Sequence, residues 1–174
     1  VGGCPNNCVK PDLNDFGVIG QRVPALDREQ CRGCRKCAVE QACPIGAAAL
    51  RDGKLEIDAA QCNHCGRCVG KCPFHALESG TYGYRIYIGG RWGKHVAQGR
   101  ALRRIFASEA EVVAVLEKAL LLFRDQGITG ERFSDTIERL GFEAVEAQLL
   151  DDSLLQRREE ILGAEKHLVG GATC

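Results

Sequence analysis

One stretch decides how the front of this chain folds: Cys62-Asn63-His64-Cys65-Gly66-Arg67-Cys68-Val69-Gly70-Lys71-Cys72-Pro73. Three cysteines stand two residues apart, and a fourth follows after three residues and directly precedes proline. An earlier run is similar, because Cys31, Cys34 and Cys37 are followed after five residues by Cys43-Pro44. Thiols so closely spaced can all face one central group. We therefore expect the two runs to form a metal-binding module.

The second run, C-x2-C-x2-C-x3-C-P, is the signature of bacterial ferredoxins with two 4Fe-4S clusters. In such proteins three thiolates of one loop wrap a cubane, and the fourth ligand comes from the other run. Zinc sites and disulfides are the alternatives, which the doubled motif disfavours because zinc sites use two separated pairs of thiols. The pattern predicts two 4Fe-4S clusters, one held by Cys31, Cys34, Cys37 and Cys72 and the other by Cys62, Cys65, Cys68 and Cys43.

Between the runs, residues 50–58 read as a small hairpin with its turn at Asp52-Gly53. This fits a ferredoxin with a pseudo-twofold axis, in which each half is a loop, a short helix and a strand. We expect the module to span residues 27–78, and its plainest function is to carry single electrons.

Composition limits what the rest of the chain can be. The chain has 174 residues, of which 45% are hydrophobic and 26% are charged, as in a folded domain with a small insert. Its 23 basic and 23 acidic residues cancel, which argues against a nucleic-acid partner. No apolar run approaches the roughly 20 residues that a membrane span needs. Without an export signal and with oxygen-sensitive clusters, a cytoplasmic location is expected.

Two further cysteines form a C-x3-C pair in Gly2-Gly3-Cys4-Pro5-Asn6-Asn7-Cys8. Spacing alone equally suits an incidental or disulfide-forming pair near a terminus. The segment resembles the second half of the sirohaem–4Fe-4S motif of the nitrite and sulfite reductase family. There, a C-x5-C pair and a later C-x3-C pair together hold one cubane. The resemblance implies that Cys4 is the third ligand and that Cys8, as the catalytic cysteine, bridges this cubane to the sirohaem iron.

The resemblance extends over most of residues 2–150. Residues 15–20 resemble the strand after the motif, residues 84–95 the glycine-rich strand and loop that resume the reductase domain, and residues 130–135 the helical tail. A ferredoxin insert at this place resembles the anaerobic and dissimilatory sulfite reductases, most closely the anaerobic catalytic subunit. The C-x5-C half is absent, and the chain contains no methionine. We therefore expect a C-terminal portion of a longer reductase, whose missing N-terminal half would complete the sirohaem-coupled cluster.

The expected fold class is α+β, a helix-flanked sheet of the reductase domain interrupted by the ferredoxin insert. The domains would be residues 1–26 with the C-x3-C motif, 27–78 as the insert, 79–162 as the returning strand and helices, and 163–174 as a flexible tail. Ser108 begins a capping box that opens a helix ending near Gly127, with an apolar stripe of Val112, Leu116, Leu120 and Phe123. Further helices are expected over 131–140 and 142–162, and their apolar faces would form core or an oligomer interface.

Residues 79–108 contain six Lys or Arg and no acidic residue, which predicts a local basic surface. Sirohaem carries carboxylates and the substrate is an oxyanion, and both suit guanidinium groups. Arg91, Lys94 and His95 lie on the glycine-rich loop and are the candidate cofactor-binding residues. A solvated surface or a docking face for an acidic partner is an equal alternative for this segment. Arg100, Arg103 and Arg104 are expected to face solvent or another subunit.

The resemblance implies an oxidoreductase that reduces sulfite to sulfide by six electrons. The ferredoxin clusters would relay electrons from a donor subunit or a ferredoxin to the sirohaem-coupled cluster. Two alternatives remain open at this point. One is a nitrite reductase that forms ammonia at the same cofactor, and the other is a non-catalytic iron-sulfur electron-transfer subunit.

Overall fold

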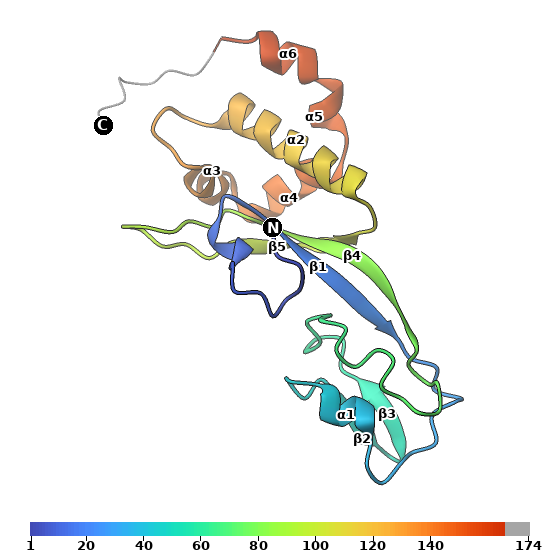
Figure 1. Cartoon of the computed structure of the whole chain (residues 1–174). Coiled ribbons are helices and arrows are strands. Elements are labelled where there is room, and N and C mark those ends of the chain that lie inside the picture. Colours follow the sequence, from blue (N-terminus) through green and yellow to red (C-terminus); the bar gives the residue numbers. More distant parts are fainter. Residues whose placement is uncertain (166–174) are drawn as a thin grey trace. The chain divides into compact units, whose positions relative to one another are not determined.

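The computed structural model describes residues 1–165 of the chain, which form two compact units (Figure 1). The first unit comprises residues 1–2, 9–19 and those from Tyr84 onward, and the second comprises residues 3–8 and 20–83. Helices and sheets are mixed, which confirms the predicted α+β class. The predicted domain boundaries at 27 and 78 fall inside the second unit and stay a prediction. Most of the predicted tail, residues 166–174, lies outside the described residues.

Three strands form the larger sheet in the order β1-β4-β5, where β1 is Phe16–Ala25, β4 is Ser79–Ile88 and β5 is Arg100–Phe106. β4 and β5 are antiparallel, and their register has an irregularity between Arg85 and Tyr87. The short 3-10 helix η1, Pro11–Leu13, precedes β1. Strand β5 was not predicted: its residues were interpreted only as part of the basic segment over residues 79–108, after the glycine-rich loop.

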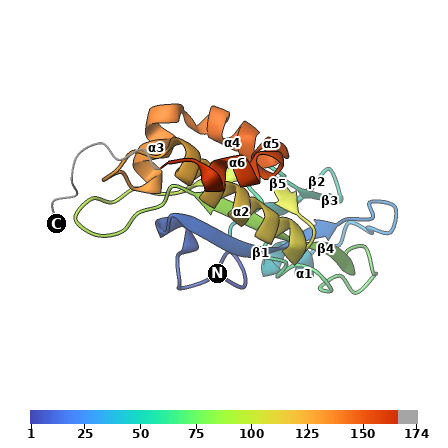
Figure 2. The ribbon, with the colours of Figure 1, turned by 90° about the horizontal axis from the view of Figure 1, so that it is seen from above.

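The helices of the first unit share one hydrophobic core with β4 and β5. They are α2 (Glu109–Gln126), α3 (Phe133–Leu140), α4 (Phe142–Leu150), α5 (Ser153–Gln156) and α6 (Arg158–Gly163). Figure 2, in which the ribbon is seen from above, shows α2 lying over the strands. Its buried residues Val115, Ala119 and Leu122 belong to the same cluster as Ile86 and Leu102 of the strands. Apolar burial of this kind is the main stabilising term of the unit.

The predicted start of α2 is confirmed, but its predicted apolar stripe is confirmed only in part: Val112 and Phe123 pack against the core, whereas Leu116 and Leu120 are exposed. The Ser108 hydroxyl accepts a hydrogen bond from the Glu111 N–H, and the Glu111 carboxylate accepts one from the Ser108 N–H. The buried face is centred on Val115, Ala119 and Leu122, whereas Leu120 is 63% exposed. Apolar residues surround nearly the whole helix, so their spacing could not select the face that meets the sheet.

The prediction of a single helix over 142–162 is also wrong. Helix α4 ends at Leu150, and Asp151 and Asp152 separate it from α5. Asp151 Oδ1 accepts hydrogen bonds from both the N–H and the hydroxyl of Ser153, at 2.8 and 2.6 Å. Asp152 forms an ion pair with the buried ammonium of Lys118, at 2.6 Å. These side-chain contacts compete with a continuous helix and start α5 on a new axis.

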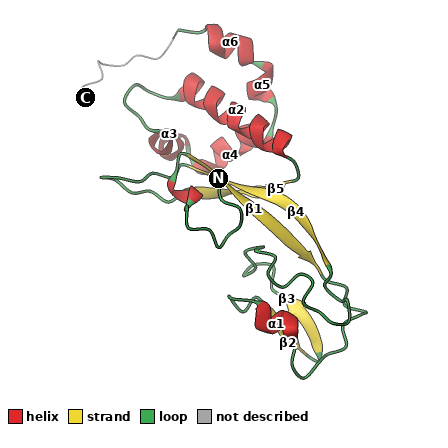
Figure 3. Cartoon of the chain, in the orientation of Figure 1, coloured by secondary structure: helices red, strands yellow, loops and turns green. Residues whose placement is uncertain are grey.

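The second unit has little regular structure (Figure 3). Its hairpin joins β2 (Ala48–Arg51) to β3 (Lys54–Ile57), with left-handed backbone at Asp52 and Gly53, which confirms the predicted turn. Helix α1, Ala38–Ala42, follows the first cysteine run. The short helix expected after the second run is wrong, since residues 69–77 form turns. Gly70, with φ of 74°, takes the chain out of helical geometry there.

Candidate metal centre

Two aspartates position the cysteine runs in the same way, one run each. Asp27 Oδ1 accepts hydrogen bonds from the backbone N–H groups of residues 29 and 30, and Asp58 Oδ1 accepts them from those of residues 60 and 61. The N–H of Asp27 donates to the carbonyl oxygen of Ala76 at 2.9 Å, and that of Asp58 donates to Ala47 at 2.8 Å. The start of each run is thus tied to the segment that follows the fourth cysteine of the other run.

The segments after the fourth cysteines also match. The third residue after Cys43 is Gly46, with φ of 68°, and the third residue after Cys72 is His75, with φ of 61°. Both Cys-Pro turns therefore close with a left-handed residue, and the next residues, Ala47 and Ala76, are buried. The two halves repeat one backbone frame around their thiols.

Four thiols of the predicted second set lie together. A small cavity is lined by Cys43, Cys62, Cys65 and Cys68. Burial raises the pKa of the Cys62 and Cys68 thiols, and the negative charges of the neighbouring thiolates raise it further. The thiols of this set therefore interact electrostatically with one another around the cavity.

Backbone amides point at two of the thiols. At Cys43, burial would raise the pKa of the thiol, but hydrogen bonds from the N–H groups of residues 45–48 outweigh burial and lower it. At Cys31, which is 7% exposed, the same balance lowers the pKa, because the Leu55 N–H donates to Sγ at 3.3 Å and Gly33 donates as well. The charges of Lys54 and Arg28 add to this effect. Thiolates held this way are prepared to bind a metal cluster.

Cysteines of both sets contact the core of the second unit. Buried Cys31 belongs to that core, and Cys37 and Cys72 of the first set pack against it, as do Cys43 and Cys68 of the second. Cys34 is half-buried. The Arg32 guanidinium lies over the Phe74 ring, 5.4 Å from its centroid. Because Arg32 follows Cys31 and Phe74 comes two residues after Cys72, this contact joins the first run to the fourth cysteine of the second run.

The described cysteines are available as thiolate ligands. All ten cysteines in residues 1–165 are free thiols. Within the same residues, no three His, Cys, Asp or Glu side chains surround a point where one metal ion would bind. A cubane spreads its four thiolates over four irons, whereas a single zinc ion binds all four ligands at about 2.0–2.3 Å.

β1 holds the second loop in place. The N–H of Arg22 donates to the carbonyl oxygen of His64 at 2.8 Å, and Arg22 and Cys65 form a parallel bridge. A Cβ on Gly66 would lie 2.7 Å from the Cβ of Arg22, so only glycine permits this approach. The Arg22 guanidinium stacks on Tyr82 of β4, 5.0 Å from the ring centroid.

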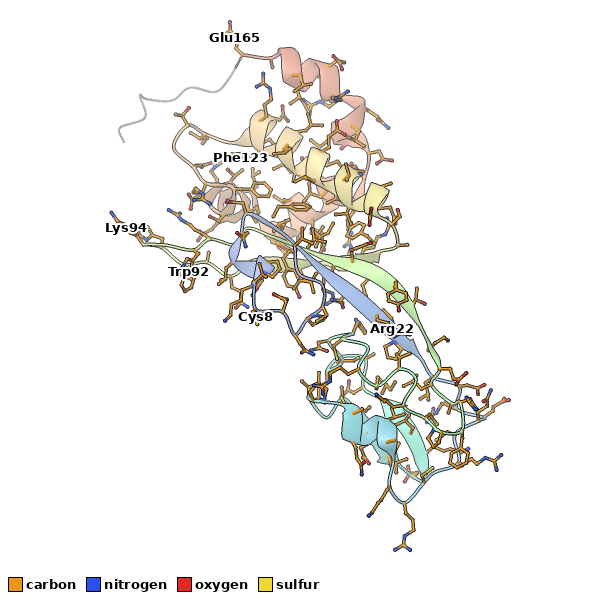
Figure 4. All side chains as sticks on the ribbon, viewed as in Figure 1. Cys8, Arg22, Trp92, Lys94, Phe123 and Glu165 are labelled. Carbon is orange, nitrogen blue, oxygen red and sulfur yellow. The ribbon has the colours of Figure 1, made fainter. Side chains whose placement is uncertain are left out.

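The C-x3-C pair lies on a tight turn before β1. The backbone N–H and side-chain amide of Asn7 both donate to the carbonyl oxygen of Cys4, at 3.1 and 2.8 Å. Cys4 is half-buried, and Cys8 is exposed (Figure 4). Two thiolates are half of the four that a cubane needs.

The three candidate cofactor-binding residues on the β4–β5 hairpin differ in their surroundings. Arg91 Nη1 contacts both carboxylate oxygens of Asp135, at 3.2 and 3.4 Å. Lys94 and His95 are exposed, and Lys94 lies near the end of the hairpin (Figure 4). A cavity of about 680 Å³ beside the hairpin is lined by Arg91, Arg100 and His95, and also by the carboxylates of Asp135, Glu138 and Glu143. Such mixed charge does not select a polyanion.

The predicted basic surface of residues 79–108 is wrong, because the helices supply acidic partners. Arg100, Arg103 and Arg104 are exposed, as expected, but each forms an ion pair: with Glu143, Glu146 and Glu111 respectively. Although the segment contains no acidic residue, carboxylates of α2 and α4 neutralise the charges of these three arginines in the folded chain.

Sequence reasoning missed Asp27 and Asp58, which position the runs. The signal was present, because each cysteine run is preceded by the pattern Asp-x-x-Gln-Cys. The backbone N–H groups that point at the thiols could not be predicted from the sequence, because nearly every residue type carries such a donor.

The repeated cysteine frame and the α+β fold define an iron-sulfur protein. The profile of the family described as "Nitrite and sulphite reductase 4Fe-4S domain" matches residues 1–156, and the chain belongs to this family. The match extends well beyond both cysteine runs into the helices of the first unit, which confirms the family resemblance found in the sequence.

Relatives within the family are named as sulfite reductases. The coenzyme F420-dependent sulfite reductase of Methanocaldococcus jannaschii is 31% identical over 82% of this chain and 23% of its own length. The crystal structure of dissimilatory sulfite reductase I has a TM-score of 0.56 and 26% identity, over 84% of this chain and 40% of that one. One component of the anaerobic sulfite reductase of Salmonella typhimurium is 38% identical over 30% of this chain and 16% of its own length. The chain thus spans less than half of these relatives.

Other relatives match over a shorter stretch. One component of the ion-translocating oxidoreductase complex of Methanosarcina acetivorans is 42% identical over 59 residues, or 34% of this chain and 22% of its own length. Among residues 1–165, none of the helices combines the length and apolar character that crossing a bilayer requires.

Proposed function

We propose that this chain is the electron-relay portion of a sirohaem-dependent sulfite reductase that reduces sulfite to sulfide. Two 4Fe-4S clusters would be held by crossed ligand sets, one by Cys31, Cys34, Cys37 and Cys72 and the other by Cys43, Cys62, Cys65 and Cys68. The observation that carries this proposal is the cavity at which Cys43 meets the three cysteines of the second run. Family membership over residues 1–156 supports placing that relay within a reductase.

The chain's own residues would do three things for the relay. Eight cysteines donate thiolates, and the repeated aspartate frame fixes their loops. Backbone N–H groups around Cys43 and Cys31 stabilise negative charge on sulfur, which makes addition of an electron easier. The hydrophobic core that cysteines of both sets contact would limit water, so each centre would change its charge with little reorganisation of its surroundings.

Cys4 and Cys8 would supply two ligands of a third cluster, which is coupled to sirohaem when the rest of the reductase is present. Sirohaem, when bound, supplies the iron at which a sulfur oxyanion is reduced. On the β4–β5 hairpin, Lys94 and His95 would approach its carboxylates, whereas Arg91 would first have to leave Asp135. Sulfur passes from +4 in sulfite to −2 in sulfide, so six electrons must arrive along the relay.

Iron and acid-labile sulfide analysis of anaerobically prepared chain tests the relay. The wild-type chain should hold about eight irons and eight sulfides. Cys43→Ser and Cys72→Ser should each lose about half of both, because each removes one ligand from a different cluster. Cys8→Ser is the matched control and should keep all of them. Stoichiometric zinc in place of iron, or no loss in either variant, would contradict the proposed ligand sets.

The absorption spectrum of the complete reductase tests the catalytic part. A Soret-like band and a red sirohaem band above the iron-sulfur shoulder are expected, with faster turnover of sulfite than of nitrite. Faster turnover of nitrite would identify the ammonia-forming reaction instead. A shoulder alone would identify a non-catalytic electron carrier.

A further inference from the structure

The two cysteine runs perform the same task, yet they carry different charge. The first reads Gln30-Cys31-Arg32-Gly33-Cys34-Arg35-Lys36-Cys37, and the second reads Gln61-Cys62-Asn63-His64-Cys65-Gly66-Arg67-Cys68. Arg32 corresponds to Asn63 and Arg35 to Gly66, so cluster binding itself does not require these two cations. Their presence in only one loop indicates a task that only this loop performs.

These cations face solvent and have no acidic partner. Arg32, Arg35 and Lys36 are exposed, and no carboxylate in residues 1–165 forms an ion pair with them. Of the acidic residues in the first loop and the β2–β3 hairpin, Asp27 accepts backbone hydrogen bonds and Glu56 pairs with Arg28. Glu29 and Asp52 are exposed and form no ion pair with these cations. This contrasts with the arginines of β5, each of which has a carboxylate partner.

The β2–β3 hairpin extends the same surface. A Cβ on Gly33 would meet the carbonyl oxygen of Gly53 at 2.0 Å, so the loop lies directly on the hairpin turn. Lys54 Nζ donates to the carbonyl oxygen of Cys31 at 2.6 Å. Exposed Arg51 lies opposite Lys54 in the antiparallel register of β2 and β3. We call Arg32, Arg35, Lys36 and Arg51 the basic loop surface.

An exposed aromatic ring lies beside this surface. Phe74 is 42% exposed, and the Arg32 guanidinium lies against its face. Aromatic and arginine side chains are the types that most often anchor protein interfaces, and surrounding charges steer the partner. The nearby thiols of Cys31 and Cys72 would place a cluster directly under the contact.

We propose that the basic loop surface is the docking site for an acidic one-electron carrier protein. The inference rests on the proposed function, because it needs a cluster at Cys31, Cys34, Cys37 and Cys72. In the step, the reduced carrier loses one electron and the iron-sulfur centre under the surface gains it. No bond is made or broken, and no proton is required. The carrier is recognised by its carboxylates and supplies the reductant.

Stopped-flow reduction of the cluster-loaded chain by a reduced acidic ferredoxin tests the proposal. With the wild-type chain, the second-order rate should be high at low ionic strength and fall steeply with added salt. The variant R35Q, which leaves the Arg32–Phe74 contact in place, should slow this reaction several-fold and weaken its salt dependence. Its reduction by dithionite, which needs no protein docking, should be unchanged.

The matched control is K71Q, which removes one exposed cation near the second run. It should react with the acidic ferredoxin at the wild-type rate. Equal slowing of K71Q and R35Q, or none in R35Q, would overturn the docking site. Iron analysis and redox titration followed by electron paramagnetic resonance come first. A wild-type chain without iron would overturn the proposed function as well, whereas loaded variants with unchanged potentials make the docking result specific.

Discussion

The carboxylate of Glu131 lies in the connection between α2 and α3 and joins that loop to α3. It accepts hydrogen bonds from Nε and Nη2 of Arg139 and from the Thr136 hydroxyl, each at 2.8 Å, and from the Ile128 N–H at 3.2 Å. The Arg139 hydrogen bonds, helped by the others and outweighing burial, lower the pKa of Glu131 from 4.5 to about 2. One residue thus fixes the connection between two helices.

Glu131→Gln should make the stability of the chain less dependent on pH. Because the pKa is lower in the folded chain, the carboxylate stabilises it fully above pH 4.5, and this contribution is lost as pH falls towards 2. The variant should unfold about 1 kcal/mol more easily at pH 7, and the difference should shrink below pH 4.5. Chemical unfolding followed by helical circular dichroism from pH 7 to pH 3 measures it. Glu138→Gln, an exposed change on α3, is the control, and an equal loss there would contradict the assignment.

At the scale of elements, the contact between the first cysteine loop and the β2–β3 hairpin requires glycine at position 33 for two separate reasons, backbone conformation and space. Gly33 has φ of 63°, and a Cβ there would lie 2.0 Å from the Gly53 carbonyl oxygen. Gly46 has φ of 68°, but nothing lies within 4 Å of its missing Cβ. The pair therefore separates backbone strain from steric exclusion.

Gly33→Ala should reduce cluster content and stability strongly, because the loop must move off the hairpin. Gly46→Ala should cost only about 1–2 kcal/mol, the ordinary strain of a left-handed alanine. His75 already occupies the equivalent left-handed position of the second half. Iron content and thermal unfolding of the two variants measure the difference. Equal losses would show that strain, and not the contact with Gly53, limits the site.

The orientation of α2 can be tested on two leucines of the same helix. Leu122 is fully buried in the core, whereas Leu120 is 63% exposed. Leu122→Ala should lower the free energy of unfolding by about 2–5 kcal/mol, and Leu120→Ala should change it by less than about 0.5 kcal/mol. Denaturant unfolding gives both values. A large loss in Leu120→Ala would restore the stripe that spacing first suggested.

At the scale of the whole molecule, the two units differ in what holds them together. The first unit has a core built from two strands and five helices. The core of the second consists of six buried residues, and cysteines form part of it or pack against it. A core that small rarely folds without a metal or a cross-link.

Removal of iron should therefore unfold one unit and leave the other. After oxidation and chelation, amide hydrogens of residues 27–78 should exchange rapidly, while those of α2 and α4 should stay protected. Hydrogen exchange read by mass spectrometry checks this on the full chain, with untreated protein as reference. Loss of protection in α2 together with the loops would show that the units fold as one.

Much of the candidate site could be predicted from local sequence. Ligand spacing, the Asp52-Gly53 turn and the Ser108 capping box each depend on residues within a few positions of one another, where backbone geometry leaves few choices. The Asp-x-x-Gln-Cys repeat is equally local. Such features are determined by the order of the residues before any packing occurs.

Tertiary structure alone decided which face of α2 is buried, where the last helix breaks, and which charges remain unpaired. Lys118 draws Asp152 out of a helix from 34 positions away, and carboxylates of α4 neutralise arginines of β5 that are isolated in sequence. The first cysteine loop keeps its cations exposed, although its local charge is no greater than that of residues 100–104. Charge and apolar surface act through space, so their outcome depends on which segments the fold brings together, whereas turns and ligand loops are set along the chain.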